Sequence, residues 1–322
     1  MMNQTFEFPD QQTIEAAHNR IRPHIHRTPV LTSKFFNQLT GGEVFFKCEN
    51  FQKTGSFKIR GACNAVFSLD NEQALKGVAT HSSGNHAQAL SLAANLRGIK
   101  AYVVMPMDSS KAKIAAVREY GGKITFCKPT LQSREEMLQV VIARTKATEI
   151  HPYNNLRIIA GQATAAIELL QDVHDLDIIL APVGGGGLLS GTALAVTYFS
   201  PFTRIIAAEP EEANDAYLSL KAGHIVPAKK PVTVADGLRT ALGTFTFPII
   251  QKHVENIVTV REDQIIEAMK LVWERMKIVV EPSAAVTVAA LVNEKIDVKG
   301  KRAGVIICGG NVDLDHLPWK TI

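Results

Sequence analysis

A lysine set among turn-forming residues is the first group in this sequence that could do chemistry. The stretch NFQKTGSFKIRGA, residues 50–62, places Lys58 between Phe57 and Ile59. Most lysines lie at the surface, with the stem along apolar groups and the ammonium in water, and that is one interpretation of Lys58. The other is an amine held in a pocket, where it acts as a nucleophile. The remaining motifs of the chain decide between the two interpretations.

Four consecutive glycines are the second candidate, and they follow the apolar run DIILAPV: Gly184, Gly185, Gly186 and Gly187. Residues without side chains let backbone N–H groups converge on an anion, and a helix that begins there adds the positive end of its dipole. A tight turn with positive φ would explain one glycine, but not four in a row. The run therefore predicts a phosphate site.

A third candidate follows the apolar run GVATH, where Ser82, Ser83 and Asn85 open a helical pattern. A helix N-cap needs only one such residue. Three of them at one helix start favour a second anion site, of a size for a substrate carboxylate. An activated lysine, a phosphate site and a carboxylate site together describe a pyridoxal-phosphate enzyme that acts on an amino acid.

Dinucleotide binding is the alternative explanation of the glycine run. GGGGLLSG does not fit G-x-G-x-x-G in any register, and the chain has no G-x-x-x-x-G-K-[ST] sequence. Glu209 ends the next apolar run, RIIAAEP, where a dinucleotide fold has the acid that binds the ribose. A dinucleotide-binding oxidoreductase in which Lys58 is structural therefore stays as a more distant alternative.

The elements that must position these groups alternate along the chain. Short apolar runs bounded by glycine or proline predict buried strands at GVATH, IKAYVVMP, KITFC, DIILAPV, RIIAAEP and AGVIICGG. Helical patterns lie between them, among them NHAQALSLAANLR, KAKIAAVREY, REEMLQVVIARTK and TAAIELLQDV. Ser133 and Glu136 form a capping-box pattern for the third of these helices. The alternation predicts parallel sheets covered by helices, with ligands at the carboxyl ends of the strands.

Composition fits a globular protein of about two domains. The 322 residues are 46% hydrophobic and 20% charged, and the net charge of +4 is spread along the chain, which disfavours a nucleic-acid partner. The uncharged window 178–199 is long enough to cross a membrane, but Pro182 and the glycines divide it into strand, loop and helix. The N-terminus shows no secretory signal, and the four cysteines have no metal-ligand spacing, so we expect a cytoplasmic protein without a membrane partner.

Several segments resemble, in order and spacing, the pyridoxal-phosphate enzymes of fold type II. They are SFKIRGA, THSSGNHAQAL, AGQAT, VGGGGLLSG, AAEP, VWERMK followed by EPSAA, and CGGNVDL. The resemblance is strongest to the serine racemase and threonine/serine dehydratase branch. It implies an α/β fold of two parallel-sheet, three-layer α/β/α domains, the smaller (77–153) inserted in the larger (1–76 and 154–322). Because the chain ends soon after CGGNVDL, we expect no regulatory C-terminal domain.

The resemblance implies how the cofactor, pyridoxal 5'-phosphate, would be held. Lys58 would carry it, with Phe57 against its ring, while Asn85 would hydrogen-bond the ring oxygen. The glycine run would hold its phosphate. Cys308 lies where this fold type usually has a serine or threonine at the pyridine nitrogen. Since a thiol donates weakly, we expect the nitrogen to stay neutral.

The resemblance also assigns the turn after GVATH to the substrate. Ser82, Ser83, Asn85 and His86 would surround the substrate carboxylate. Ser83 in addition matches a serine that, in racemases of this branch, faces the substrate opposite the lysine. Lys58 would remove the α-proton, and two outcomes would follow: loss of the β-hydroxyl, or return of a proton from Ser83 on the far face.

A divalent-cation site is implied on the loop EPEEAND. Glu209, the carbonyl of Ala213, and Asp215 fall at the offsets of the cation site of this branch. Two carboxylates and a carbonyl suit Mg²⁺ or Ca²⁺, because both ions prefer oxygen ligands. A solvated acidic loop without a metal is the alternative.

ATP is an effector in some racemases of this branch, where it binds near the positions of Ser33, Lys53 and Thr54. Lys53 and Thr54 match, but Lys34 follows Ser33 where a small residue is usual. ATP activation therefore stays open.

The implied function is a serine/threonine dehydratase that releases ammonia, with serine racemase activity. L-Serine would give pyruvate, and L-threonine would give 2-oxobutanoate. Arg134 and Arg239 are candidates for binding a second substrate carboxylate, with a structural role as the alternative for both. Threo-3-hydroxyaspartate dehydratase is therefore an alternative function. We expect a small amino-acid substrate and a homodimer.

Overall fold

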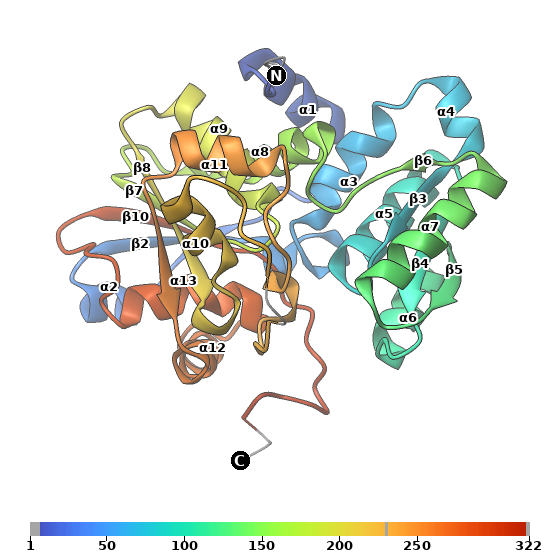
Figure 1. Ribbon diagram of the computed structural model, residues 1–322. Coiled ribbons are helices and arrows are strands. Elements are labelled where there is room, and N and C mark those ends of the chain that lie inside the picture. Colours follow the sequence, from blue (N-terminus) through green and yellow to red (C-terminus); the bar gives the residue numbers. More distant parts are fainter. Residues whose placement is uncertain (1–6, 229–230, 320–322) are drawn as a thin grey trace.

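The strands of the protein form two separate sheets (Figure 1), as seen in a computed structural model that describes residues 7–228 and 231–319. The larger sheet has the order β1 (Val30–Thr32), β2 (Glu43–Cys48), β10 (Arg302–Ile307), β7 (Ile178–Pro182), β8 (Arg204–Pro210) and β9 (Asn256–Val260). The smaller sheet has the order β5 (Gly122–Cys127), β4 (Ala101–Pro106), β3 (Val78–His81) and β6 (Thr148–Glu149). All neighbouring strands are parallel except β1, which runs antiparallel to β2.

Helices cover both faces of each sheet. On the six-stranded sheet, α8 (Leu156–Asp172) and α9 (Gly187–Phe199) lie on one side and α12 (Glu262–Met276) and α13 (Pro282–Val292) on the other (Figure 1). On the four-stranded sheet the main helices are α5 (Asn85–Arg97), α6 (Lys111–Glu119) and α7 (Leu131–Thr145). The remaining helices are α1 (Gln11–Ile21), α2 (Lys34–Thr40), α3 (Lys58–Phe67), α4 (Asn71–Lys76), α10 (Asp215–Ala222) and α11 (Thr246–His253).

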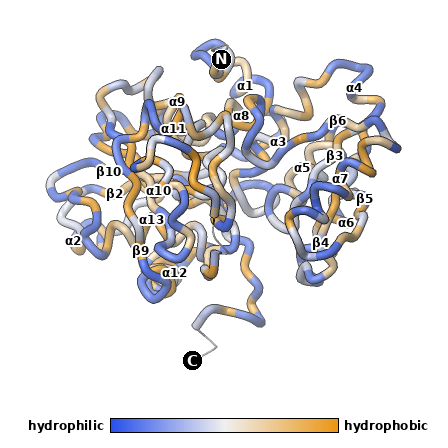
Figure 2. Tube along the Cα trace, in the orientation of Figure 1, coloured by the Kyte–Doolittle hydropathy of each residue, from blue (hydrophilic) through white to orange (hydrophobic). Residues whose placement is uncertain are grey.

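The central strands of both sheets are largely apolar because both faces of each sheet are covered. Every residue of β7, IILAP, is buried, and five of the six residues of β10 are. Figure 2 shows hydrophobic residues along the strands of both sheets. The largest core cluster lies between the six-stranded sheet and α8, α9 and α13.

The expected α/β architecture with parallel sheets is confirmed. The six predicted strands are β3, β4, β5, β7, β8 and β10, and the four predicted helices are α5, α6, α7 and α8. The uncharged window 178–199 is β7, a loop and α9. Among the described residues, no helix is long and apolar enough to cross a membrane. All strands of the smaller sheet fall within residues 77–153, while the division into two domains stays a prediction.

The predicted capping box at Ser133 is wrong, because α7 begins earlier than the pattern indicated. Leu131 is its first residue and Thr130 is the N-cap, whose hydroxyl accepts a hydrogen bond from Ser133 N (3.2 Å). The Ser133 hydroxyl instead accepts from Lys128 N (3.2 Å). Threonine is itself a favoured N-cap residue, and here it takes the place that the pattern gave to Ser133.

Candidate active site

Lys58 lies where α3 begins, beside the carboxyl end of β10. Phe57 N donates to Cys308 O (3.0 Å), and Ser56 forms an isolated bridge with Gly309. Lys58 Nζ donates to the carbonyl oxygen of Pro152 (3.3 Å) and lies 5.0 Å from the centre of the Phe57 ring. The predicted partners Phe57 and Cys308 are therefore brought next to Lys58, at the edge of the sheet where ligands of α/β proteins bind.

The Lys58 amine loses its proton more easily than an ordinary lysine, because its pKa is lowered. Although part of the side chain is accessible to solvent, loss of hydration lowers the pKa of Lys58 to about 8, and the nearby Cys308 and Glu281 only oppose this shift. No carboxylate within hydrogen-bond distance fixes the charged form, because the one hydrogen-bond partner described for Nζ is the Pro152 carbonyl oxygen. The lowered pKa raises the fraction of neutral amine near physiological pH above that of an ordinary lysine, and the neutral form is the one that a base or nucleophile requires.

The glycine run forms the turn between β7 and α9, and its backbone is closely approached by two other loops. Gly186 alone of the four has a positive φ, of 87°. A Cβ on Gly184 would lie 2.9 Å from Leu238 Cα, and one on Gly185 would lie 2.4 Å from the Tyr153 ring. The turn thus keeps its backbone bare at the start of α9, where a helix has N–H groups without intrahelical partners. These features fit a phosphate group.

The segment His151–Asn154, which the sequence analysis did not single out, connects Lys58 with the glycine turn. Pro152 accepts the hydrogen bond from Lys58, and Tyr153 packs on Gly185 and Gly187. His151 Nδ1 accepts from Asn154 N (2.9 Å), while Asn154 Oδ1 accepts from Phe245 N (2.8 Å). The only sequence signal was the polar run HPYNN.

The turn between β3 and α5 does not act as an ordinary helix cap. The N-cap of α5 is Gly84, and no side chain caps the helix. Ser82 Oγ accepts from Gly84 N (3.3 Å), and Asn85 is the first helical residue. Because the serines are not used as caps, their hydroxyls and the free N–H groups of α5 remain for an anion.

His86 is buried and neutral, with a side chain that has no donor for a carboxylate. Burial lowers its pKa to about 3, and the positive charge of Lys58 acts in the same direction. A carbonyl oxygen only accepts hydrogen bonds, so the contact of Nε2 with Ile150 O (3.1 Å) places the proton on Nε2. Nδ1 is buried without a partner. Side-chain contacts to a substrate carboxylate in this turn thus fall to Ser82 and Ser83, since the side-chain amide of Asn85 donates to Glu281.

Glu281 is a buried acid at the centre of the predicted cofactor residues, and the sequence analysis missed it. Asn85 Nδ2 donates to both of its carboxylate oxygens (3.1 Å each), and Asn311 N donates to Oε2 (3.2 Å). Cys308 Sγ donates weakly to Oε1 (3.8 Å), and burial together with the carboxylate raises the pKa of this thiol. Burial raises the pKa of Glu281 to about 7. The network fixes the side-chain amide of Asn85, whose Oδ1 accepts from Asn311 Nδ2 (2.9 Å).

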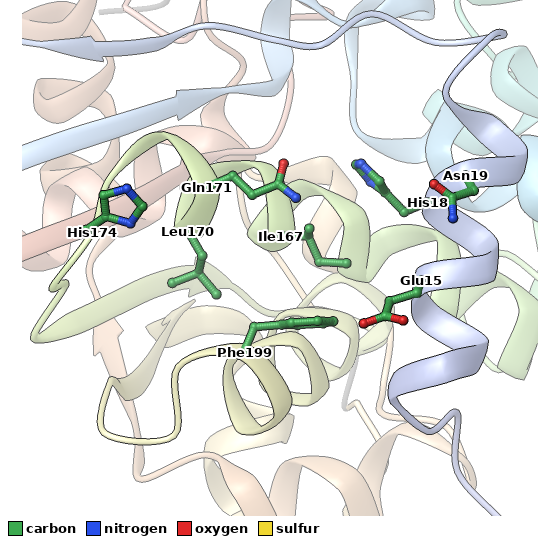
Figure 3. Close-up of a pocket in the computed structure, with 8 residues that line it drawn as sticks. All are labelled: Glu15, His18, Asn19, Ile167, Leu170, Gln171, His174 and Phe199. Atoms are coloured by element: carbon green, nitrogen blue, oxygen red, sulfur yellow. The ribbon is translucent and has the colours of Figure 1, made fainter.

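Two pockets of the described structure lie away from Lys58. One, of about 430 Å³, lies between α1 and the C-terminal parts of α8 and α9 (Figure 3), and its lining residues are Glu15, His18, Asn19, Ile167, Leu170, Gln171, His174 and Phe199. The other, of about 360 Å³, is lined by residues at both ends of the His151–Asn154 segment, among them Ile150 and Asn154. Neither contains a predicted site residue, so the chemistry of the groups around Lys58 identifies the site rather than the size of a cavity.

The predicted cation ligands are brought together after β8. Glu209 is fully buried and accepts from Ala216 N (3.0 Å) and Tyr217 N (2.9 Å), whereas neither oxygen of the buried Asp215 has a partner. Burial raises the pKa of Glu209 to about 9 and that of Asp215 to about 6. Among the described residues, no group of three or more His, Cys, Asp and Glu side chains could hold a metal. The predicted set has two, plus the Ala213 carbonyl.

The two arginines considered for a second carboxylate differ in their surroundings. Arg239 is exposed, and its Nε donates to the Thr233 carbonyl oxygen (3.1 Å). Arg134, in α7, has a buried Nε without a partner. Burial is the main cause of the lowered pKa of His81, and the positive charge of Arg134 acts in the same direction. Since His81 ends β3 directly before Ser82, Arg134 is the arginine near the carboxylate turn.

Comparisons with known proteins agree with this geometry. Residues 21–309 match the family described as "Pyridoxal-phosphate dependent enzyme". The chain is 54% identical to the beta-hydroxyaspartate dehydratase of Paracoccus denitrificans over 312 residues (97% of this chain, 99% of the relative) and 52% identical to the serine racemase of Dictyostelium discoideum over 309 residues (94% and 95%). The crystal structure of a threonine deaminase from T.th. superposes with a TM-score of 0.90 at 43% identity, covering 95% of this chain and 99% of that one. The chain therefore belongs to the pyridoxal-phosphate-dependent enzyme family, within the group that includes serine racemases and threonine deaminases.

Proposed function

We propose that this enzyme dehydrates β-hydroxy amino acids, L-serine to pyruvate and L-threonine to 2-oxobutanoate with release of ammonia, and that it racemises serine. One observation carries the proposal: the Lys58 amine, with its pKa lowered to about 8, contacts the segment that packs on the glycine turn. The relatives include a serine racemase, a hydroxyaspartate dehydratase and a threonine deaminase, which share a β-hydroxy amino acid as the substrate.

The residues around Lys58 fit pyridoxal phosphate. The glycine turn would hold its phosphate, Asn85 its ring oxygen, and Phe57 one face of its ring. When bound, the cofactor supplies an electron sink for the negative charge that develops at the substrate Cα. The Cys308 thiol donates toward Glu281, so it would offer the pyridine nitrogen no strong donor.

The protein's own groups would divide the proton transfers between the two faces of the substrate. The Ser82–Asn85 turn holds the carboxylate with N–H and hydroxyl donors, which fixes the Cα–H bond relative to Lys58. The neutral amine of Lys58 takes the α-proton from one face. Departure of the β-hydroxyl completes dehydration, whereas a proton delivered by the Ser83 hydroxyl on the other face completes racemisation.

Ser83→Ala should separate the two activities. D-Serine formation from L-serine should fall by about 10²-fold or more, the usual effect of losing a positioned acid. Dehydration of D-serine should fall as much, because its α-proton faces residue 83, while dehydration of L-serine should fall far less. Keto acid and enantiomer are followed separately for L-serine, D-serine and L-threonine. An equal loss of all activities would make Ser83 only a carboxylate ligand, and a parent enzyme inactive on the whole panel would contradict the proposed function.

Threo-3-hydroxyaspartate is the second candidate substrate, and the unpartnered Nε of Arg134 favours it. A guanidinium near the carboxylate turn would bind the additional carboxylate of this substrate. Arg134→Gln should lower kcat/KM for hydroxyaspartate about 10-fold or more, with a smaller effect on L-serine. Arg239 is exposed, so Arg239→Gln is the matched control and should leave kcat/KM for both substrates unchanged. Equal effects of Arg134→Gln on both substrates would remove the reason for this candidate.

A divalent cation at Glu209, the Ala213 carbonyl and Asp215 is part of the proposal. Burial disfavours the charged forms of these two carboxyl groups and raises their pKa values. A bound cation would favour the charged forms again. The unpartnered oxygens of Asp215 fit this role.

Removal of the cation should lower thermal stability in a pH-dependent way. Adding Mg²⁺ or Ca²⁺ at about 100 times its dissociation constant should raise the Tm by about 5 °C. For carboxyls with raised folded pKa values, the stabilising contribution is present below the ordinary values of 4.5 and 3.8 and is lost as pH rises toward the folded values, so the stability of the chelated protein should decline between about pH 4 and pH 9. Asp215→Asn should abolish the response to metal. If neither chelator nor metal changes the Tm across this pH range, the loop is a solvated acidic turn without a metal.

Assembly, effector and location complete the proposal. The enzyme would act as a homodimer in the cytoplasm on a small amino acid, without a nucleic-acid or membrane partner. ATP would bind near Ser33, Lys53 and Thr54. The backbone at Thr54 has an unusual conformation, with a positive φ of 60°. The Thr54 carbonyl oxygen accepts a hydrogen bond from Asn311 Nδ2 (2.7 Å).

A further inference from the structure

An ion pair joins the two sheets near the candidate active site. Lys113 Nζ of α6 lies 2.6 Å from Asp236 Oδ2 of the 3₁₀ helix η4 (Asp236–Leu238). Helix α6 packs on β5 of the smaller sheet, whereas η4 packs on α13 of the larger one. Within residues 7–228 and 231–319, this is the only ion pair between 77–153 and the rest of the chain.

The Asp236 side of the pair is fixed to the cofactor residues. Gly237 N donates to Ser283 Oγ (3.1 Å), and Ser283 follows Glu281 in the first turn of α13. Leu238 lies against the glycine turn, where a Cβ on Gly184 would be 2.9 Å from Leu238 Cα. Helix η4 therefore contacts both the phosphate turn and the helix that Glu281 caps.

The Lys113 side leads to the substrate turn. Lys113 lies in the first turn of α6, whose N-cap Ser110 accepts from Lys113 N (3.3 Å). Helix α6 packs on α5, and α5 begins with the Ser82–Asn85 turn. Both charges of the pair also act on Glu281. Burial is the main cause of its raised pKa; the charge of Asp236 raises the pKa further, and the charge of Lys113 lowers it. The pair thus acts electrostatically on the acid that Asn85 contacts.

We propose that Lys113 and Asp236 are positioning residues, whose ion pair holds the smaller sheet so that the Ser82–Asn85 turn lies over Lys58. Their side chains are 29% and 46% exposed, and a pair of this kind contributes little to the stability of a fold. A small free energy is nevertheless enough to shift the population of a closed arrangement, and a weak contact opens readily for substrate entry and product release. The inference rests on the proposed function only in assigning the substrate carboxylate to this turn.

Kinetics at different salt concentrations test the positioning role. Lys113→Gln and Asp236→Asn should each raise KM for L-serine about two- to five-fold at low ionic strength, with a smaller change in kcat and no change in Tm beyond about 1 °C. The double variant should be no worse than either single one, because both changes remove the same contact. In the parent enzyme KM should rise with salt, whereas the variants should respond much less. Lys111→Gln, an exposed lysine in the same helical turn, is the matched control and should behave as the parent.

Amide hydrogen exchange gives a readout that does not depend on turnover. In the cofactor-loaded protein without substrate, Lys113→Gln should exchange faster than the parent in α6, in η4 and at residues 82–85, while the strands of both sheets stay protected. If the enzyme turns over none of the tested amino acids, the proposed function fails and this arm still decides the role of the pair. The positioning role would be overturned if exchange in Lys113→Gln equals that of the parent. It would also be overturned if the effects of the two single changes on KM add up in the double variant, or if variant and parent respond to salt in the same way.

Discussion

Replacing Lys58 by alanine abolishes turnover and leaves the chain folded, if Lys58 is both cofactor anchor and base. Rates of keto-acid and D-serine formation should fall by at least about 10³-fold, because neither outcome is reached without proton removal from Cα. The Tm should not fall by more than a few degrees, since burial disfavours the Lys58 ammonium and its hydrogen bond to Pro152 O is long at 3.3 Å.

The control for this change is a lysine beside the smaller sheet. Lys100 is exposed and precedes β4, and Lys100→Ala should leave both activities within about two-fold of the parent. Keto-acid production near the parent rate in a folded Lys58→Ala protein would remove Lys58 from the chemistry and return it to the surface-lysine interpretation.

The largest expected loss of stability follows from breaking a buried ion cluster two residues after Lys58. Arg60 is fully buried and donates to Glu49 (Nε–Oε2 and Nη2–Oε1, 2.7 Å each) and to Glu168 (Nη1–Oε1 and Nη2–Oε2, 2.8 Å each). Lys47 Nζ also contacts Glu168 (2.8 Å) and donates to Thr28 O (2.7 Å). The cluster joins β2, α3 and α8, and with them the helix that begins at Lys58.

The pKa values in the cluster show which contacts dominate. Burial alone would raise the pKa of Glu168, but the hydrogen bonds and charge of Arg60, helped by Lys47, lower it to about 2. Burial lowers the pKa of Lys47 despite Glu168, because its ammonium has one close carboxylate while Arg60 has two. Arg60 is therefore the residue on which the buried charges depend.

Arg60→Met should lower the free energy of unfolding by about 3–5 kcal/mol, because it leaves two buried carboxylates without their main partner. The matched control is Arg204→Met, which breaks an equally bidentate but half-exposed pair with Glu255 and should cost about 1 kcal/mol or less. Denaturant unfolding of both variants and the parent at pH 7 measures the difference. Equal losses in the two variants would contradict the assigned role of burial.

The cluster also has a pH signature in the parent protein. Because the folded pKa of Glu168 is lowered, its stabilising contribution is present above its ordinary pKa of 4.5 and is lost as pH falls toward about 2. The free energy of unfolding of the parent should therefore decline across this window, and Arg60→Met should show a shallower decline.

Local patterns in the sequence were enough to predict much of this protein. Apolar runs between glycines marked β3, β4, β5, β7, β8 and β10, since buried parallel strands leave a signal within a few residues. The glycine turn and the Ser82–Asn85 turn were found because each lies where a helix follows a strand, whereas Lys58 was found from the turn-forming residues around it. The glycine turn and Cys308 lie close together because they follow β7 and β10, which are neighbours in one parallel sheet. The Ser82–Asn85 turn follows a strand of the other sheet, so this rule did not place it.

Residues whose role depends on distant contacts could not be found in the same way. Glu281 precedes a proline at a helix start, as many N-cap positions do, and only its contacts with Asn85 and Asn311 show it to be central. Tyr153 matters because it covers two glycines more than 30 positions away. The edge strand β1 is three residues long and was missed for lack of length. The capping box at Ser133 failed because Thr130 offered an equally good cap one turn earlier.

The most direct test of the account is to find which lysine carries the cofactor. The enzyme is loaded with pyridoxal phosphate, reduced with borohydride so that the bond to the lysine becomes permanent, digested, and mapped by mass spectrometry. The account predicts the phosphopyridoxyl group on Lys58, in the segment GSFKIRGA. A cofactor attached to another lysine, or to none, would contradict it.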